Sequence, residues 1–293
     1  MNAITAPNHV LSIEMRPLSP ALGALVLGID ASQPLPPDTV NKLLDIWHDH
    51  GVLCLPDQTL DENEQVRFGQ YFGELATTQG EYQISKSHPA IMYITNEKEN
   101  GQYVGALPDG EMFFHSDMCY VEKPSKATML FAMNIPKQGG NTLFANMYKA
   151  YESLPEEVRT RIQGLRAVNS YEPGINAPTT AMRAPGQAAT PSADYRSFSH
   201  PMVCTHPQTG RKALYVNRLM TEYVEGLSPT ESSRLLNYLF DFQERPEFIY
   251  EHRWTPGDLL MWDNRCTLHA RSNFDASELR KMRRITVKGE VIV

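Results

Sequence analysis

The sequence lacks the surplus of basic residues that a protein needs to hold a nucleic acid. Its 293 residues include 27 lysines and arginines against 34 aspartates and glutamates, which gives a formal net charge of −7. Proteins that bind a phosphate backbone neutralise it with an excess of lysine and arginine. We therefore expect no nucleic acid among the partners of this chain.

The sequence also lacks paired cysteines and long apolar runs. Its four cysteines are scattered and show no C-x-x-C spacing: Cys54, Cys119, Cys204 and Cys266. This pattern predicts free thiols in a reducing compartment rather than a disulfide framework. No apolar run approaches the roughly 18 residues of a membrane helix, and the first residues show no basic start followed by an apolar stretch. We expect a cytoplasmic protein with no membrane partner.

The predicted elements favour a mainly β fold into which helices are inserted. Strand-like apolar runs recur from about residue 111 onward, whereas helical patterns are few: 38–51, 61–73, 155–164 and 228–244. Two of these helices begin with capping boxes, at Asp61 and Ser228. Strands out of step with helices are typical of a β sandwich or barrel and not of a doubly wound parallel sheet.

Two segments are predicted to be hairpins, and one long segment shows no period. The hairpins are residues 202–217 and 248–264, the second turning at Pro256 and Gly257. Residues 172–199 are rich in proline, alanine, threonine and glycine. Because structureless loops of this length inside compact domains are often lids or binding loops, we expect this one to be a substrate lid or loop.

The stretch GEMFFHSDMCYVEKP, residues 110–124, places His115 and Asp117 two positions apart in an apolar, aromatic segment. Side chains two apart on a strand point to the same face, so the imidazole and the carboxylate can converge on one point. Such a pair fits a metal site, and it fits equally well a histidine that is hydrogen-bonded to its neighbour in a strand.

A second imidazole ligand has to come from elsewhere, and the main candidates are His88, His200, His206 and His269. His269 follows a polar corner, DNRC, at the end of an apolar strand, which suits a ligand delivered from a neighbouring strand. Two histidines and one carboxylate leave metal positions open for a co-substrate and O₂, as in non-haem Fe(II) oxygenases. A structural zinc site is instead closed by four protein ligands, commonly cysteines.

Several motifs occur in a fixed order: FFHSD, IPKQGGNTLFANMYKAYESLP, HPMVCTHPQTGRKALYVN, PEFIYEHRWTPGDLLMWDNRCTLHAR and ELRKMRRITV, with GVLCLPDQTLDENEQVRFGQYFGEL upstream. This set resembles the taurine/2,4-dichlorophenoxyacetate dioxygenase (TauD/TfdA) family of Fe(II)- and 2-oxoglutarate-dependent oxygenases. The resemblance implies a single domain, residues 1–293, with a double-stranded β-helix (jelly-roll, cupin-like) core. It also implies Fe(II), 2-oxoglutarate and O₂ as cofactors.

The resemblance further implies which residues hold these groups. His115, Asp117 and His269 match the iron ligands of the family. Thr142, in the motif GGNT, and Arg280, which follows His269 by eleven positions, match the residues that hold 2-oxoglutarate. These matches turn the pair of residues 115 and 117 into part of a predicted iron site.

The substrate side of the site is implied in the same way. Arg284, fifteen positions after His269, matches the arginine that binds the acidic group of the substrate. On a strand Arg280 and Arg284 share a face, so both guanidinium groups can enter one cavity and each can grip a carboxylate with two N–H donors. Tyr120, Tyr215 and His88 are further expected pocket residues.

The expected function is hydroxylation of a small anionic substrate bearing a carboxylate or sulfonate, with decarboxylation of 2-oxoglutarate to succinate. Bond cleavage can follow the hydroxylation. An alternative is desaturation or another oxidation of a small carboxylic acid in a biosynthetic pathway. A zinc-dependent hydrolase is a weaker alternative, because Thr142 and Arg280 would then have no role. A non-catalytic binding protein is also weaker, because it would need no ferrous site. The resemblance also leads us to expect a homo-oligomer, a dimer or tetramer.

Overall fold

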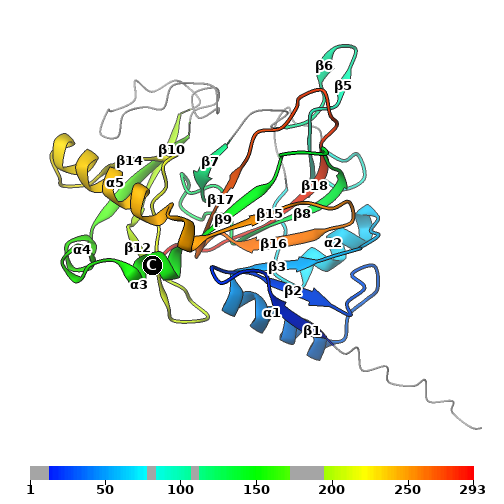
Figure 1. Cartoon of the computed structure of the whole chain (residues 1–293), viewed down its shortest axis with the longest axis horizontal. Helices are drawn as coiled ribbons and strands as arrows, with labels where there is room; N and C mark the ends of the chain where they lie inside the picture. The colour runs from blue at the N-terminus through cyan, green and yellow to red at the C-terminus, as the bar shows by residue number, and fades with distance from the viewer. Residues whose placement is uncertain (1–12, 78–83, 107–111, 172–194) are drawn as a thin grey trace, which may run out of the picture.

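The computed structural model describes residues 13–77, 84–106, 112–171 and 195–293, and its core consists of two facing β-sheets (Figure 1). The larger sheet has seven strands in the order β1 (Glu14–Pro17), β2 (Ala24–Leu27), β3 (Val52–Leu55), β16 (Leu259–Asp263), β8 (Ala127–Asn134), β18 (Lys281–Val287) and β4 (Ile91–Thr95). The smaller sheet has four strands in the order β15 (Ile249–His252), β9 (Thr142–Asn146), β17 (Thr267–Arg271) and β7 (Met112–His115).

Helices and smaller strand groups surround these two sheets. A three-stranded sheet is formed by β11 (Arg196–Pro201), β10 (Arg166–Tyr171) and β14 (Thr221–Val224), and two strand pairs by β12 (Val203–Thr205) with β13 (Lys212–Leu214) and β5 (Lys98–Glu99) with β6 (Gln102–Tyr103). The described helices are α1 (Pro37–His50), α2 (Glu62–Gln70), α3 (Met147–Ser153), α4 (Glu156–Ile162), α5 (Pro229–Gln243) and the short 3₁₀ helix η1 (Pro246–Phe248).

Strand β16 shows how alternation fills both faces of the larger sheet. Its residues Leu259 and Met261 pack into a core shared with α1 and α2. The alternate residues Leu260 and Trp262 pack into a second core, which Phe144 of β9 joins from the smaller sheet. The second core therefore lies between the sheets, and it is on this inner side that a cavity can be lined from both.

The helix signals read from the sequence are confirmed. The side chain of Asp61 accepts a hydrogen bond from the backbone N–H of Glu64, and Ser228 does the same for Glu231, so both capping boxes are present. Helix α1 ends at His50 and is capped by Gly51, whose φ of 71° lies in the left-handed region that glycine enters without steric cost.

One predicted hairpin is confirmed and the other is wrong. Within residues 202–217, β12 and β13 pair antiparallel. Within 248–264, however, β15 joins the smaller sheet and β16 the larger one. The turn at Pro256–Gly257 is held by bonds to other segments: the N–H of Gly257 donates to the carbonyl of Ala132 at 2.9 Å, and its carbonyl accepts from the N–H of Gln58 at 2.8 Å. The chain therefore crosses between sheets here.

The fold class is confirmed as mainly β with helical insertions around a jelly-roll core. Of the predicted loop 172–199, residues 172–194 lie outside the described residues, whereas 196–199 belong to β11 and pair with β10. Among the helices that the structure describes, no helix is both long and apolar enough to cross a membrane.

Candidate metal centre and arginine pocket

The smaller sheet brings His115, Asp117 and His269 together. Strands β7 and β17 pair so that His115 and His269 stand directly opposite each other, with ring centroids 4.1 Å apart. The Nε2 atom of each histidine lies 3.9 Å from Oδ1 of Asp117. Their possible ligand atoms all lie within 4.8 Å of one another, and all three residues are at most 9% exposed. A single metal ion can bridge donor atoms at this spacing.

Asp117 reaches this point by a route that differs from the predicted strand. Strand β7 ends at His115, and Asp117 lies in the turn that follows. That turn is tied to the corner after β16, because the hydroxyl of Ser116 donates to the carbonyl of Asn264 at 2.8 Å and the N–H of Asp117 donates to Oδ1 of Asn264 at 3.3 Å. The expectation of convergence is met, although not by strand alternation.

Two donors hold the other carboxylate oxygen of Asp117. Oδ2 accepts a hydrogen bond from the hydroxyl of Thr128 at 2.5 Å and lies 2.9 Å from Nη2 of Arg284. The side-chain N–H of Asn264 donates in turn to the hydroxyl of Thr128 at 3.1 Å. With Oδ2 occupied, Oδ1 is the atom that faces the two histidines, which favours a one-oxygen ligand.

Burial and neighbouring charges set the protonation of the cluster. Burial would raise the pKa of Asp117, but Arg284, His269 and His115 lower it below its ordinary value. Burial lowers the pKa of His115 and lowers that of His269 well below its ordinary value. Nδ1 of His115 lies 2.9 Å from the carbonyl of Phe113, so Nδ1 carries the proton and Nε2 keeps its lone pair. Neutral imidazoles and an ionised carboxylate are the forms that bind a metal.

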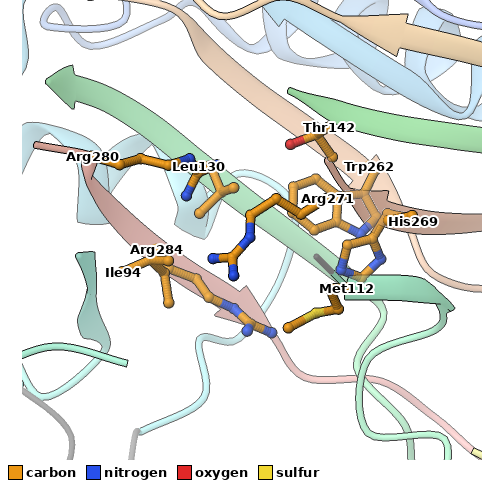
Figure 2. A pocket seen from close by; sticks show the side chains of 10 residues that line it. Ile94, Met112, Leu130, Thr142, Trp262, His269, Arg271, Arg280 and Arg284 are labelled. Atoms are coloured by element: carbon orange, nitrogen blue, oxygen red, sulfur yellow. The ribbon is translucent and has the colours of Figure 1, made fainter. Parts of the chain in front are cut away.

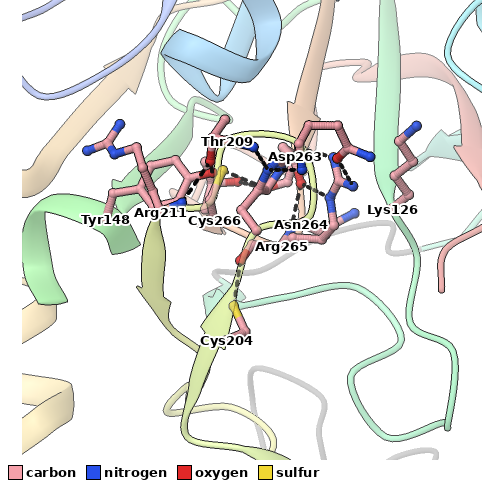
Figure 3. Close-up of polar contacts among 12 residues, drawn as sticks. Lys126, Tyr148, Cys204, Thr209, Arg211, Asp263, Asn264, Arg265 and Cys266 are labelled. Atoms are coloured by element: carbon pink, nitrogen blue, oxygen red, sulfur yellow. Dashed lines mark hydrogen bonds and ion pairs between the residues drawn. The ribbon is translucent and has the colours of Figure 1, made fainter. Parts of the chain in front are cut away.

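A buried ion-pair network fixes the corner between β16 and β17 that precedes His269 (Figure 3). Asp263 pairs with Arg265 at 2.6 Å, and Nε2 of His206 lies 3.0 Å from the same oxygen of Asp263. The hydroxyl of Thr267 donates to the carbonyl of Asp263 at 2.7 Å. His206, a candidate ligand in the sequence, is thus engaged here and does not join the metal cluster.

Figure 2 shows a pocket beside the metal cluster, and arginines dominate its polar lining. It is lined by Ile94, Met112, Leu130, Thr142, Trp262, His269, Ala270, Arg271, Arg280 and Arg284. The empty space between these residues, including the part that is open to solvent at the mouth, amounts to about 440 Å³. The structure therefore brings Thr142, Arg280 and Arg284 to one cavity with His269, as the sequence predicts.

Arg280 is a buried cation in this pocket. It is 3% exposed, and its Nε donates to the carbonyl of Gly140 at 3.2 Å. In the described part of the chain no acidic side chain pairs with it. Burial and the charge of Arg271 lower the pKa of Arg280 to about 9. A guanidinium in such surroundings is stabilised by an anion, so the pocket suits a carboxylate ligand.

Thr142 is held ready on the opposite wall of the pocket. Its hydroxyl accepts a hydrogen bond from the indole N–H of Trp254 at 3.0 Å, which leaves the hydroxyl proton of Thr142 available as a donor. Gly140, two residues earlier, leaves room for Arg280, because a Cβ atom there would lie 3.1 Å from Nε of Arg280. The motif GGNT therefore forms the turn and also contributes to the pocket, through the hydroxyl of Thr142 and the space that Gly140 leaves for Arg280.

The three remaining predicted site residues lie outside the residues that line this pocket. Tyr120 stacks on Tyr171 with ring centroids 4.8 Å apart, and Tyr215 is buried in the neighbouring core. Burial raises the pKa of both Tyr120 and Tyr215, and the charge of Asp117 adds to this. The structure does not bring His88 to the site: its Nε2 lies 2.9 Å from Oδ1 of Asn63 on α2.

Reasoning from the sequence missed three residues of the site. Thr128 and Asn264 position Asp117, and Arg271 lines the pocket. Alternation along the apolar strand 127–134 places Thr128 on the same face as the inner-core residue Leu130, so a weak signal existed. Arg271 stands two positions after His269, the same spacing that led to the pair of residues 115 and 117.

Comparisons with known proteins match nearly the whole chain. The family model described as "Taurine catabolism dioxygenase TauD, TfdA family" matches residues 14–286, a range that contains every predicted site residue. Pentalenolactone F synthase of Streptomyces avermitilis is 34% identical over 276 residues, 90% of either chain. The (S)-phenoxypropionate/alpha-ketoglutarate-dioxygenase of Sphingobium herbicidovorans is 31% identical over 95% of this chain and 96% of its own. The solved structure of AAD-2 with Mn(II) and N-oxalylglycine has a TM-score of 0.76 at 28% identity, covering 96% of this chain and 100% of that one.

Proposed function

The chain belongs to the taurine catabolism dioxygenase TauD, TfdA family, and from this premise we propose that it hydroxylates a small organic anion bearing a carboxylate or a sulfonate. It is an oxidoreductase that uses Fe(II), 2-oxoglutarate (alpha-ketoglutarate) and O₂ and releases succinate. When the hydroxylated carbon carries an ether, amine or sulfonate, the product collapses and that bond is cleaved.

One observation carries the proposal. The cavity beside the metal cluster is lined by Arg280, Arg284 and Thr142, and His269 lines the same cavity. Two separate guanidinium groups support two separate anionic ligands, a co-substrate and a substrate, since each fork matches one carboxylate or sulfonate. A zinc-dependent hydrolase or a non-catalytic binding protein would leave this second anion-binding group without a purpose.

We assign the metal to Nε2 of His115, Nε2 of His269 and Oδ1 of Asp117. These residues fit a metal because the imidazoles are neutral, the carboxylate is ionised and the three donors converge. When bound, Fe(II) supplies the O₂ chemistry that side chains cannot perform. The role of the protein is to hold these ligands on one side and leave the other open to the two organic molecules.

We assign the far carboxylate of 2-oxoglutarate to Arg280 and Thr142. Arg280 is buried and offers N–H donors to the cavity, and the hydroxyl proton of Thr142 is free to donate. Hydrogen bonds to a charged group contribute roughly 1.5–3 kcal/mol each, and their direction fixes the ligand. The keto end of the molecule is then oriented toward His269 and the metal.

Arg284 is assigned to the acidic group of the substrate. One edge of its guanidinium already contacts Asp117, and its buried Nε finds no hydrogen-bond partner within the described residues. An arriving anion would supply that partner. Because Arg284 would then touch both the substrate and a metal ligand, it positions the reacting carbon relative to the metal, and such placement decides which C–H bond reacts.

A second candidate function is an oxidation other than hydroxylation, such as desaturation of a small carboxylic acid in a biosynthetic pathway. The specific observation that favours it is the similarity to a synthase, pentalenolactone F synthase. It uses the same metal and co-substrate residues. Halogenation is disfavoured, because halide binding normally takes the coordination position that Asp117 supplies here.

We further propose that the chain works in the cytoplasm as a homo-oligomer. The four cysteines are free and buried, which supports a reducing compartment. Light scattering after size exclusion reads the oligomeric state directly.

The test of the function is a panel of small carboxylates, sulfonates and sulfate esters, with succinate release as the readout. We expect release above the substrate-free rate for at least one anion. Its uncharged amide or alcohol analogue is the matched control and should give much less. Equal stimulation by charged and uncharged analogues would contradict the role of Arg284, and no succinate under any condition would contradict the dioxygenase.

A further inference from the structure

The third arginine of the pocket, Arg271, belongs to neither of the roles assigned above. It ends strand β17, two positions after His269, and is 7% exposed. In the smaller sheet it stands opposite Thr142 of β9 on one side and Met112 of β7 on the other. Figure 2 shows its guanidinium inside the pocket, between those of Arg280 and Arg284 in that view.

Arg271 is closely associated with Arg280. The guanidinium carbons of Arg271 and Arg280 lie 5.6 Å and 5.9 Å from the centroid of the same ring, that of Phe274. After burial, the charge of Arg271 is the other cause that lowers the pKa of Arg280. Both guanidinium groups therefore lie at one ring and in one pocket, where a single carboxylate can accept hydrogen bonds from both.

The backbone around Phe274 fixes this arrangement. The N–H of Gly140 donates to the carbonyl of Asn273 at 3.1 Å, and the N–H of Ser272 donates to the carbonyl of Asn141 at 3.0 Å. Gly139 forms a bridge with Phe274 itself. The GGNT turn is therefore tied to the backbone of the residue whose ring both guanidinium groups approach.

We propose that Arg271 and Arg280 together grip the distal carboxylate of 2-oxoglutarate, so that Arg271 selects 2-oxo acids that carry a second carboxylate. This rests on the proposed function and adds a residue to it. The position of Arg271 favours the co-substrate over the primary substrate, because its neighbours are Thr142 and Arg280. The arginine assigned to the substrate, Arg284, is instead paired with Asp117.

The test is equilibrium binding of two 2-oxo acids to the Mn(II)-loaded protein without O₂, which needs no turnover. 2-Oxoglutarate and 2-oxovalerate have the same carbon chain, and only the first has a distal carboxylate. Arg271→Gln should weaken 2-oxoglutarate binding roughly ten- to hundred-fold, the loss expected for hydrogen bonds to a charged group. Binding of 2-oxovalerate should change less than about two-fold.

Two further variants make the test selective. Arg271→Lys keeps the charge but not the planar fork, so it should lose less affinity for 2-oxoglutarate than Arg271→Gln does. It also serves if the glutamine variant does not fold. Arg245→Gln is the matched control, since Arg245 is exposed, its guanidinium lies over the ring of Phe242, and it is not among the residues that line the pocket. This control should bind both acids as the wild type does.

The outcomes separate the inference from the proposed function. Unchanged 2-oxoglutarate affinity in both Arg271 variants would overturn the inference, and so would equal losses for the two acids, which indicate a merely structural residue. If the wild-type protein itself binds 2-oxoglutarate no better than 2-oxovalerate, the assignment of the co-substrate site fails, and the inference with it. A selective loss confined to 2-oxoglutarate supports both.

Discussion

Thr128 is expected to control metal affinity although it is not a ligand. It is fully buried in β8, and its hydroxyl donates to Oδ2 of Asp117 while accepting from the side-chain N–H of Asn264. Thr128→Val replaces the hydroxyl with a methyl group of nearly the same shape. The variant therefore removes one hydrogen bond from Asp117 and leaves an N–H of Asn264 without its acceptor, with little change in packing.

The size of the effect follows from these contacts. Loss of a group that orients a metal ligand typically weakens metal binding 10- to 100-fold. Arg284 still holds Oδ2 of Asp117 at 2.9 Å after the substitution, so we expect the lower part of that range, about 10-fold. Stability should also fall, because a buried donor left unpaired costs roughly 1–3 kcal/mol.

The assay is anaerobic titration of Mn(II) or Fe(II) into the metal-free variant, together with a thermal melt. The matched control is Thr205→Val, which makes the same change at an exposed residue of β12 and should leave metal affinity unchanged. A Thr128→Val variant that melts below the wild type yet binds metal within about two-fold of it would refute the reasoning, because Thr128 would then support only the fold.

Three further predictions concern the anion-binding residues and one buried histidine. Arg280→Gln should weaken 2-oxoglutarate binding at least ten-fold while metal affinity stays near that of the wild type; a loss of metal binding instead would misplace Arg280. Arg284→Ala should raise the substrate KM and spare 2-oxoglutarate binding, and the reverse pattern would mean that the two arginines have exchanged roles. Burial lowers the pKa of His200 from 6.5 to about 4. Between these two pH values His200 is protonated in the unfolded chain and neutral in the folded protein, so acid favours unfolding. The melting temperature should fall between pH 6.5 and 4, and His200→Gln should flatten that dependence; parallel curves would contradict it.

Local signals in the sequence were sufficient for the elements that depend on neighbouring residues. The capping boxes at Asp61 and Ser228 need only contacts three residues apart, and both formed. The predicted hairpin 248–264 failed for the opposite reason. Its turn at Gly257 is bound to Ala132 and Gln58, segments far away in sequence, and no local pattern reveals that a strand passes to another sheet.

In the candidate site, too, the ligand residues could be predicted from the sequence, whereas the contacts that position them could not. Order and spacing of motifs pointed to His115, Asp117 and His269, which the fold brings together. They could not reveal how Asp117 arrives there, because the bonds of its turn to Asn264 bridge 147 and 148 positions. Arg271 could not be predicted as a pocket residue from the sequence, because its place in the pocket depends on its packing with Phe274 and Arg280 in the folded protein.

The metal site can be tested by anaerobic titration of the protein with Fe(II) and 2-oxoglutarate, followed by visible absorption. We expect a weak charge-transfer band that saturates with 2-oxoglutarate, because His115, Asp117 and His269 would hold the metal on one side and leave the other side open to the co-substrate. Asp117→Ala should lose the band. A protein that shows no band, or whose band is undiminished in Asp117→Ala, would contradict the assignment of the metal site.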